Sequence, residues 1–130
     1  MARVDKYDPI SGGFRANLAA AITDPNQIGV PLAVGLNASG KVVLGSGATG
    51  VRGVLVADQA KAANEVVDVM TAGEIVDLNE ANFDPGAKYL GQANGAVNTT
   101  AGGVEVGVTV ADQSPTTGVI RSRLIVRVKS

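Results

Sequence analysis

The chain has 130 residues, a formal net charge of −1 and a hydrophobic fraction of 45%, which suits a single domain with one core. It contains no cysteine and no histidine, and this inventory excludes disulfides, thiolate nucleophiles, most hydrolase triads and most zinc sites. The nearly balanced charge gives no long-range field for nucleic acid or an anionic membrane, and no apolar run approaches the ~20 residues of a membrane span. We therefore expect no nucleic acid, no membrane, no metal and no cofactor as partners.

The N-terminal stretch predicts an extended arm. Its first 13 residues are polar and of mixed charge, and they include a proline and two adjacent glycines. Tyr7, Ile10 and Phe14 are apolar residues whose spacing suits docking onto a partner surface. A disordered tail is the alternative interpretation.

Residues 14–23 contain helix-forming Ala and Leu and end at an Asp-Pro stop. A short helix and an irregular strand are both open for this segment. We predict an arm at residues 1–27, with a possible short helix, followed by a β-rich domain at residues 28–130.

From residue 28 onward, valine-rich runs alternate with turns that contain glycine. The expected strands lie at residues 30–36, 41–44, 50–57, 65–70, 74–78, 87–90, 103–110 and 120–129. Their regular spacing is typical of an all-β barrel or sandwich.

The last two expected strands show clear alternation. In the first of them, Val104, Val106, Val108 and Val110 share one face, which we expect to point inward. In the second, one face is apolar and the other carries cations, and these are Arg121, Arg123, Arg127 and Lys129. The cations are explained either by solvation and protection of an edge strand or by a salt-sensitive contact with an acidic protein surface. No aromatic residue interleaves with them, so nucleic acid is the poorer partner.

A heptapeptide occurs twice, as GVLVADQ from Gly53 and as GVTVADQ from Gly107, 54 positions apart. The similarity extends over residues 39–59 and 94–113 if one residue is skipped, which indicates a duplicated hairpin around one core. Asp58 and Asp112 are then copies of one structural turn residue, each accepting backbone N–H groups. The alternative is a pair of carboxylates that performs acid–base chemistry or binds a cation.

Residues 45–50 read GSGATG and match the GxGxxG fingerprint of dinucleotide-binding folds. That fingerprint requires a helix to begin at its last glycines, whereas strand-forming residues follow here, so the segment indicates a glycine-rich turn. Residues 50–53 are faintly similar to a glycine-arginine segment of trimeric, β-rich nucleotide pyrophosphatases of the dUTPase kind. A β-rich nucleotide-hydrolysing enzyme therefore remains as an alternative, and it would need Asp58, Asp77 or Asp112 to converge on a metal.

The ordered pattern resembles the head decoration, or capsid cement, proteins of tailed bacteriophages. The resemblance rests on the polar arm, the segments IGVPLAVGLNASGKVVLGSGATGVRGVLV, VVDVMTAGEIVDL and FDPGAKYLGQANGAVNTT, the strand VEVGVTVADQ and the closing IRSRLIVRV. It implies a small β-barrel or β-tulip-like domain on the capsid exterior that stabilises the shell and is not an enzyme. It also implies a homo-oligomer, with a trimer favoured, that binds the major capsid protein.

The same resemblance suggests where the capsid contact lies. The arm would supply Tyr7, Ile10 and Phe14 as apolar anchors, and Arg121 and Arg123 are the candidate polar contacts. Another phage structural subunit, of a tail tube or a head fibre, is the nearest alternative and would polymerise with itself.

Overall fold

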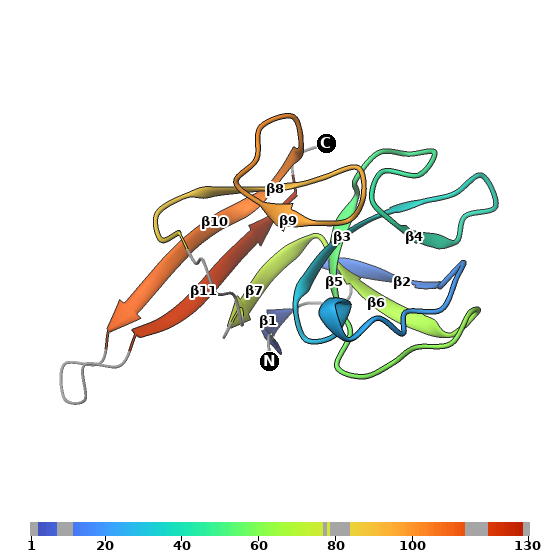
Figure 1. Ribbon diagram of the computed structural model, residues 1–130, viewed down its shortest axis with the longest axis horizontal. Helices are drawn as coiled ribbons and strands as arrows, with labels where there is room; N and C mark the ends of the chain where they lie inside the picture. The colour runs from blue at the N-terminus through green and yellow to red at the C-terminus, as the bar shows by residue number, and fades with distance from the viewer. Residues whose placement is uncertain (1–2, 8–11, 77, 79–83, 114–119, 129–130) are drawn as a thin grey trace.

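The computed structural model describes residues 3–7, 12–76, 78, 84–113 and 120–128, and these form two antiparallel β-sheets (Figure 1). Sheet A has the strand order β1 (Arg3–Tyr7), β7 (Ala72–Val76), β11 (Ile120–Arg127), β10 (Val104–Gln113), β8 (Lys88–Gly91) and β9 (Val97–Asn98). Sheet B has the order β2 (Gly13–Asn17), β6 (Val66–Met70), β5 (Gly53–Val56), β3 (Pro31–Leu36) and β4 (Val42–Leu44). A 3-10 turn, η1 (Pro25–Gln27), is the helical element of these residues. The all-β prediction is confirmed, and across the described residues the sheets stay open and do not close into a barrel.

The internal duplication is larger than the repeated hairpin that the sequence indicates. Sheet B, in the order β2-β6-β5-β3-β4, corresponds strand for strand to the β7-β11-β10-β8-β9 part of sheet A, and β1 is added at the edge. In each copy the two strands of the repeated segment do not pair with each other. They lie on either side of the preceding strand, so that β4 and β5 flank β3 while β9 and β10 flank β8.

The turns that follow β3 and β8 repeat bond for bond. The amide of Asn37 donates to the carbonyl of Lys41 at 2.9 Å, and that of Gln92 donates to the carbonyl of Ala96 at 2.8 Å. Gly40 and Gly95 occupy the position with positive φ in these two turns, at +78° and +96°. The repeat is therefore structural at the level of individual backbone bonds.

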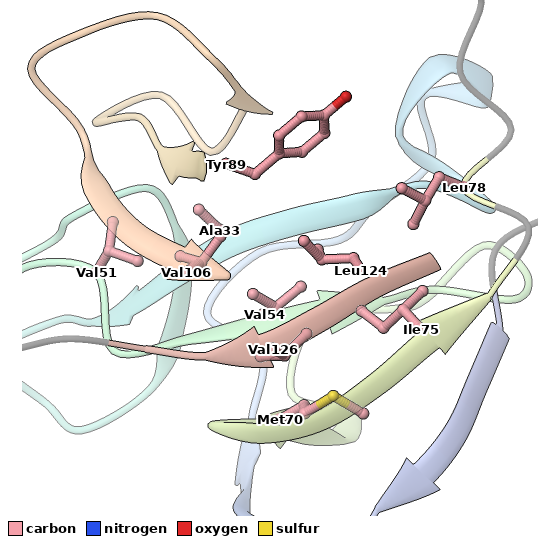
Figure 2. Packing of buried hydrophobic residues seen from close by; sticks show 10 residues of the cluster. All are labelled: Ala33, Val51, Val54, Met70, Ile75, Leu78, Tyr89, Val106, Leu124 and Val126. Atoms are coloured by element: carbon pink, nitrogen blue, oxygen red, sulfur yellow. The ribbon is translucent and has the colours of Figure 1, made fainter. Parts of the chain in front are cut away.

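The main core lies between the two sheets (Figure 2). Val34 and Val69 lie on one face of sheet B, and Tyr89 and Leu124 lie at the equivalent positions of sheet A. We call the face that carries these residues the inner face of each sheet, and the opposite face its outer face. The inner face of sheet A packs on the outer face of sheet B. The cluster between them comprises Ala33, Val51, Val54, Met70, Ile75, Leu78, Tyr89, Val106, Leu124 and Val126.

A second core covers the inner face of sheet B and depends on residues that the sequence assigned to the arm. Gly13–Asn17 is a strand, so the strand alternative holds for the start of this segment, and Leu18 and Ile22 are buried against Leu32, Val34, Val42, Leu55, Ala57, Val67 and Val69. An isolated bridge joins Leu18 to Val42, and the amide of Ala19 donates to the carbonyl of Val42 at 2.9 Å. These contacts bring the two edges of sheet B together at one point and close its inner face with residues 18–22.

A β-bulge in β10 reverses the facing that alternation predicts. Glu105 pairs with Leu90 and Gly107 pairs with Tyr89, which leaves Val106 as the additional residue. Val106 is fully buried, but beyond it Thr109 points inward and is buried, while Val108 lies on the outer face and is exposed. The expectation that Val104 to Val110 keep their valines on one inward face is therefore wrong beyond Val106, because the bulge shifts the period by one residue.

The hydroxyl of Thr109 ties the turn before β8 to β10. Thr109 Oγ1 accepts the amide of Ala87 at 3.0 Å and donates to the carbonyl of Asp84 at 2.5 Å. We expect Thr109→Val, which keeps the shape and removes the hydroxyl, to lower the free energy of unfolding by about 1–2 kcal/mol, measured by urea denaturation. A neutral substitution would mean that water replaces the hydroxyl and that this contact is not buried as described.

Candidate interaction surface

The three residues proposed as anchors of the arm do not share one setting in the structure. Tyr7 lies in β1, opposite Gly73 of β7, and Ile10 lies outside the described residues. Phe14 lies in β2, opposite Val69, and packs partly buried against the second core. The fold therefore uses Phe14 within the domain, and β1 lies at one edge of sheet A.

The cationic stripe of β11 is partly neutralised within the chain. Arg123 Nη1 lies 2.7 Å from Glu74 Oε1, with 26% of the arginine side chain and 8% of the glutamate side chain exposed. Arg121 lies opposite Asp112 in the β10–β11 ladder, Arg127 is exposed opposite Ala72, and Lys129 lies outside the described residues. Sequence reasoning missed Glu74, which the pairing of β7 with β11 brings beside the stripe.

The two aspartates of the repeated heptapeptide occupy different environments. Asp58 follows β5, is exposed, and forms an ion pair with Lys61 at 3.3 Å. Asp112 lies within β10, so the turn expected there is replaced by strand. The difference arises because β10 pairs with β11 as far as Gln113, whereas the register between β5 and β6 is the single pair Val54–Met70. Among the described residues, no three acidic, histidine or cysteine side chains cluster in a way that could hold a metal ion.

The glycine-rich loop between β4 and β5 joins the two copies. Strand β5 follows it, as expected for a turn and unlike the helix of a dinucleotide fold. Within sheet B, the amide of Gly45 donates to the carbonyl of Ala33 at 2.8 Å. The amide of Ser46 in this loop donates to the carbonyl of Ala93 at 3.4 Å, and the amide of Ala33 in β3 donates to the carbonyl of Gly95 at 2.8 Å. The β8–β9 turn of sheet A is thereby held against β3 and its loop in sheet B.

Two clefts of moderate size lie at the junctions of the fold. One, of about 310 Å³, is lined by apolar and amide-bearing residues, namely Asn26, Gln27, Val30, Pro31, Leu32, Leu78, Tyr89, Asn94, Gly95, Ala96 and Val97. The other, of about 370 Å³, is lined by Phe14, Leu36, Thr49, Arg52, Thr71 and Val128. No aspartate or glutamate is among the described residues that line either cleft.

No protein-family model matches the chain, and no curated protein matches it either. A solved structure from Mycobacterium phage Patience is similar to it, with a TM-score of 0.78 and 21% sequence identity. The chain shares its fold with a bacteriophage chain. The similarity covers 99% of this chain and 96% of the Patience chain, so it includes both copies of the five-stranded unit. In the described part of the chain, no helix is long and apolar enough to cross a membrane.

Proposed function

We propose that this protein is a structural virion component of a tailed bacteriophage that binds the outer surface of the capsid and stabilises the shell. The observation that carries the proposal is the likeness in fold, over nearly the whole of both chains, to a protein of Mycobacterium phage Patience. The ordered sequence pattern of capsid decoration proteins supports the same role. The proposal makes the major capsid protein the partner and places the protein on the exterior of the virion as a homo-oligomer.

The edge position of β1 supports a role for the N-terminal segment in this contact. β1 pairs with β7 on one side, and the ladder shifts register between Val4 and Lys6. On its other side no strand of the described residues pairs with it. An edge strand presents backbone N–H and C=O groups to which another chain can bind.

Deleting residues 1–7 is expected to abolish binding to capsids while the two cores stay folded. β7 keeps its pairing with β11, and Gly12, whose carbonyl accepts the amides of Thr71 and Ala72, is retained. The measurement is co-sedimentation of purified protein with particles of the encoding phage that lack this protein, with circular dichroism as the test of folding. The matched control replaces residues 1–7 with Gly and Ser and keeps the length.

Cryo-EM of particles that have bound the full chain tests the location. Density on the outer face of the shell is the expected result. Density confined to a tail tube or a head fibre would contradict the proposed location. Full particle binding by the truncated chain would contradict the role of residues 1–7 in the contact.

A further inference from the structure

The outer face of sheet A carries three neighbouring residues on three adjacent strands. Val108 of β10 pairs with Lys88 of β8 on one side and with Ile125 of β11 on the other. Val108 is 41% exposed, Ile125 is partly exposed and Lys88 is exposed. The bulge at Val106 places Val108 on this face, so this valine does not contribute to the core between the sheets.

The internal repeat shows what the equivalent positions of sheet B do. Val54 of β5 pairs with Ala33 of β3 and with Met70 of β6, in the same arrangement as Val108 with Lys88 and Ile125. Ala33, Val54 and Met70 are buried because sheet A packs on them (Figure 2). The outer face of sheet A is thus the repeat equivalent of a face that binds a β-sheet.

Charges of both signs lie beside Val108 and Ile125, and four of them form ion pairs within the chain. Lys88 Nζ lies 4.0 Å from Glu105 Oε1 on one side of the apolar residues, and Arg123 pairs with Glu74 on the other side. Arg127, which shares this face of β11 with Ile125, adds an exposed cation opposite Ala72, so the described charges of the face are three cations and two anions. A face that carries both signs can place its cations against the anions of an identical face.

The other faces of the two sheets are already covered within the chain. The inner face of sheet A packs on the outer face of sheet B, and Leu18 and Ile22 cover the inner face of sheet B. A second copy can therefore place sheet against sheet only by using the same outer face of its own sheet A. Such a contact is isologous and has two-fold symmetry.

We propose that two copies of this chain associate through the outer faces of their A sheets, with Val108 and Ile125 at the centre. The inference goes beyond the proposed function, because self-association of the purified chain needs no capsid. A two-fold contact also differs from the trimer that the family resemblance favours, and the oligomeric state separates the two arrangements.

The experiment measures the mass of the purified full chain by analytical ultracentrifugation over a range of concentrations. The wild type is expected to form a dimer, and Val108→Glu is expected to weaken dimerisation roughly tenfold or more, since the contact would bury an unpaired carboxylate. The matched control is Val66→Glu, because Val66 is 57% exposed on β6 of sheet B and lies outside the proposed contact. Circular dichroism checks that each variant folds.

A variant that dimerises more tightly gives a second test, because such a gain cannot result from a loss of folding. The double variant Lys88→Ala with Glu105→Ala places at position 88 the residue that sheet B has at Ala33 and removes both members of the ion pair together, so it is expected to tighten the dimer. A monomeric wild type, a trimer that persists in Val108→Glu, or an equal loss in Val66→Glu would overturn the proposal. A dimer lost in Val108→Glu with particle binding retained supports the two-fold contact and leaves the capsid role intact. A monomeric wild type whose particle binding is lost in Val108→Glu would assign this face to the capsid instead.

Discussion

Gly45→Ala is expected to lower the free energy of unfolding by at least about 3 kcal/mol. Gly45 has a φ of +85°, a conformation that costs an L-residue roughly 1–2 kcal/mol. A Cβ at this position would lie 1.8 Å from the carbonyl oxygen of Ala93, which is a backbone atom of the β8–β9 turn. The loop of sheet B must then move away from sheet A, and the bonds that join the copies weaken. Urea denaturation followed by circular dichroism gives the measurement.

Gly50→Ala is the matched control for this substitution. Gly50 lies in the same loop with a φ of +80°, but no atom lies within 4 Å of the position that its Cβ would take. It therefore isolates the conformational cost, and we expect a loss of about 1 kcal/mol. Equal losses at the two glycines would show that the loop does not approach Ala93 as closely as the structure has it.

Glu74→Ala is expected to cost about 3–5 kcal/mol, because it leaves the guanidinium of Arg123 largely buried without this carboxylate. The double variant Glu74→Leu with Arg123→Met is expected to recover most of that loss, since apolar residues of similar size often replace a buried ion pair without penalty. A double-mutant cycle in urea measures the coupling of the two side chains.

The exposed pair between Arg15 and Asp68 provides the comparison for Glu74. Its Nε–Oδ1 distance of 2.6 Å is about as short as the 2.7 Å between Arg123 and Glu74. However, 71% of the Arg15 side chain and 50% of the Asp68 side chain are exposed. Removing it with Arg15→Ala is expected to cost less than about 1 kcal/mol, because water screens the charges. If the two pairs prove equally costly to break, burial is not what makes Glu74 important.

Much of the fold can be predicted from the sequence, because burial imposes a readable pattern on each strand. Leu124 and Val126 are buried, as alternation along the last strand predicts, and the repeated heptapeptide indicates the duplication. The order in which the strands pair is harder to predict from the sequence. Nothing within residues 39–59 indicates that β3 lies between β4 and β5, because that order depends on a strand outside the repeated segment.

The bulge in β10 shows why the candidate surface was harder to predict. The extra residue of the bulge changes which valines face outward. The sequence of residues 104–110 still alternates regularly, so alternation alone does not reveal the change. Gly107 is the local signal, since a glycine inside a strand often marks a bulge or a close approach of backbone. A Cβ there would lie 2.2 Å from the carbonyl oxygen of Ile125. The ion pair of Glu74 with Arg123 joins residues 49 positions apart in the sequence, and no local signal indicates it.

The way the second copy stacks on the first has a consequence for the size of the molecule. The inner face of sheet A packs on the outer face of sheet B. A five-stranded copy with both of its faces uncovered could stack further copies in the same way without limit. Leu18 and Ile22 terminate this growth at one end, as the polar caps of solenoid proteins do. The connection between β2 and β3, residues 18–30, thus limits the stack to the two copies on this side.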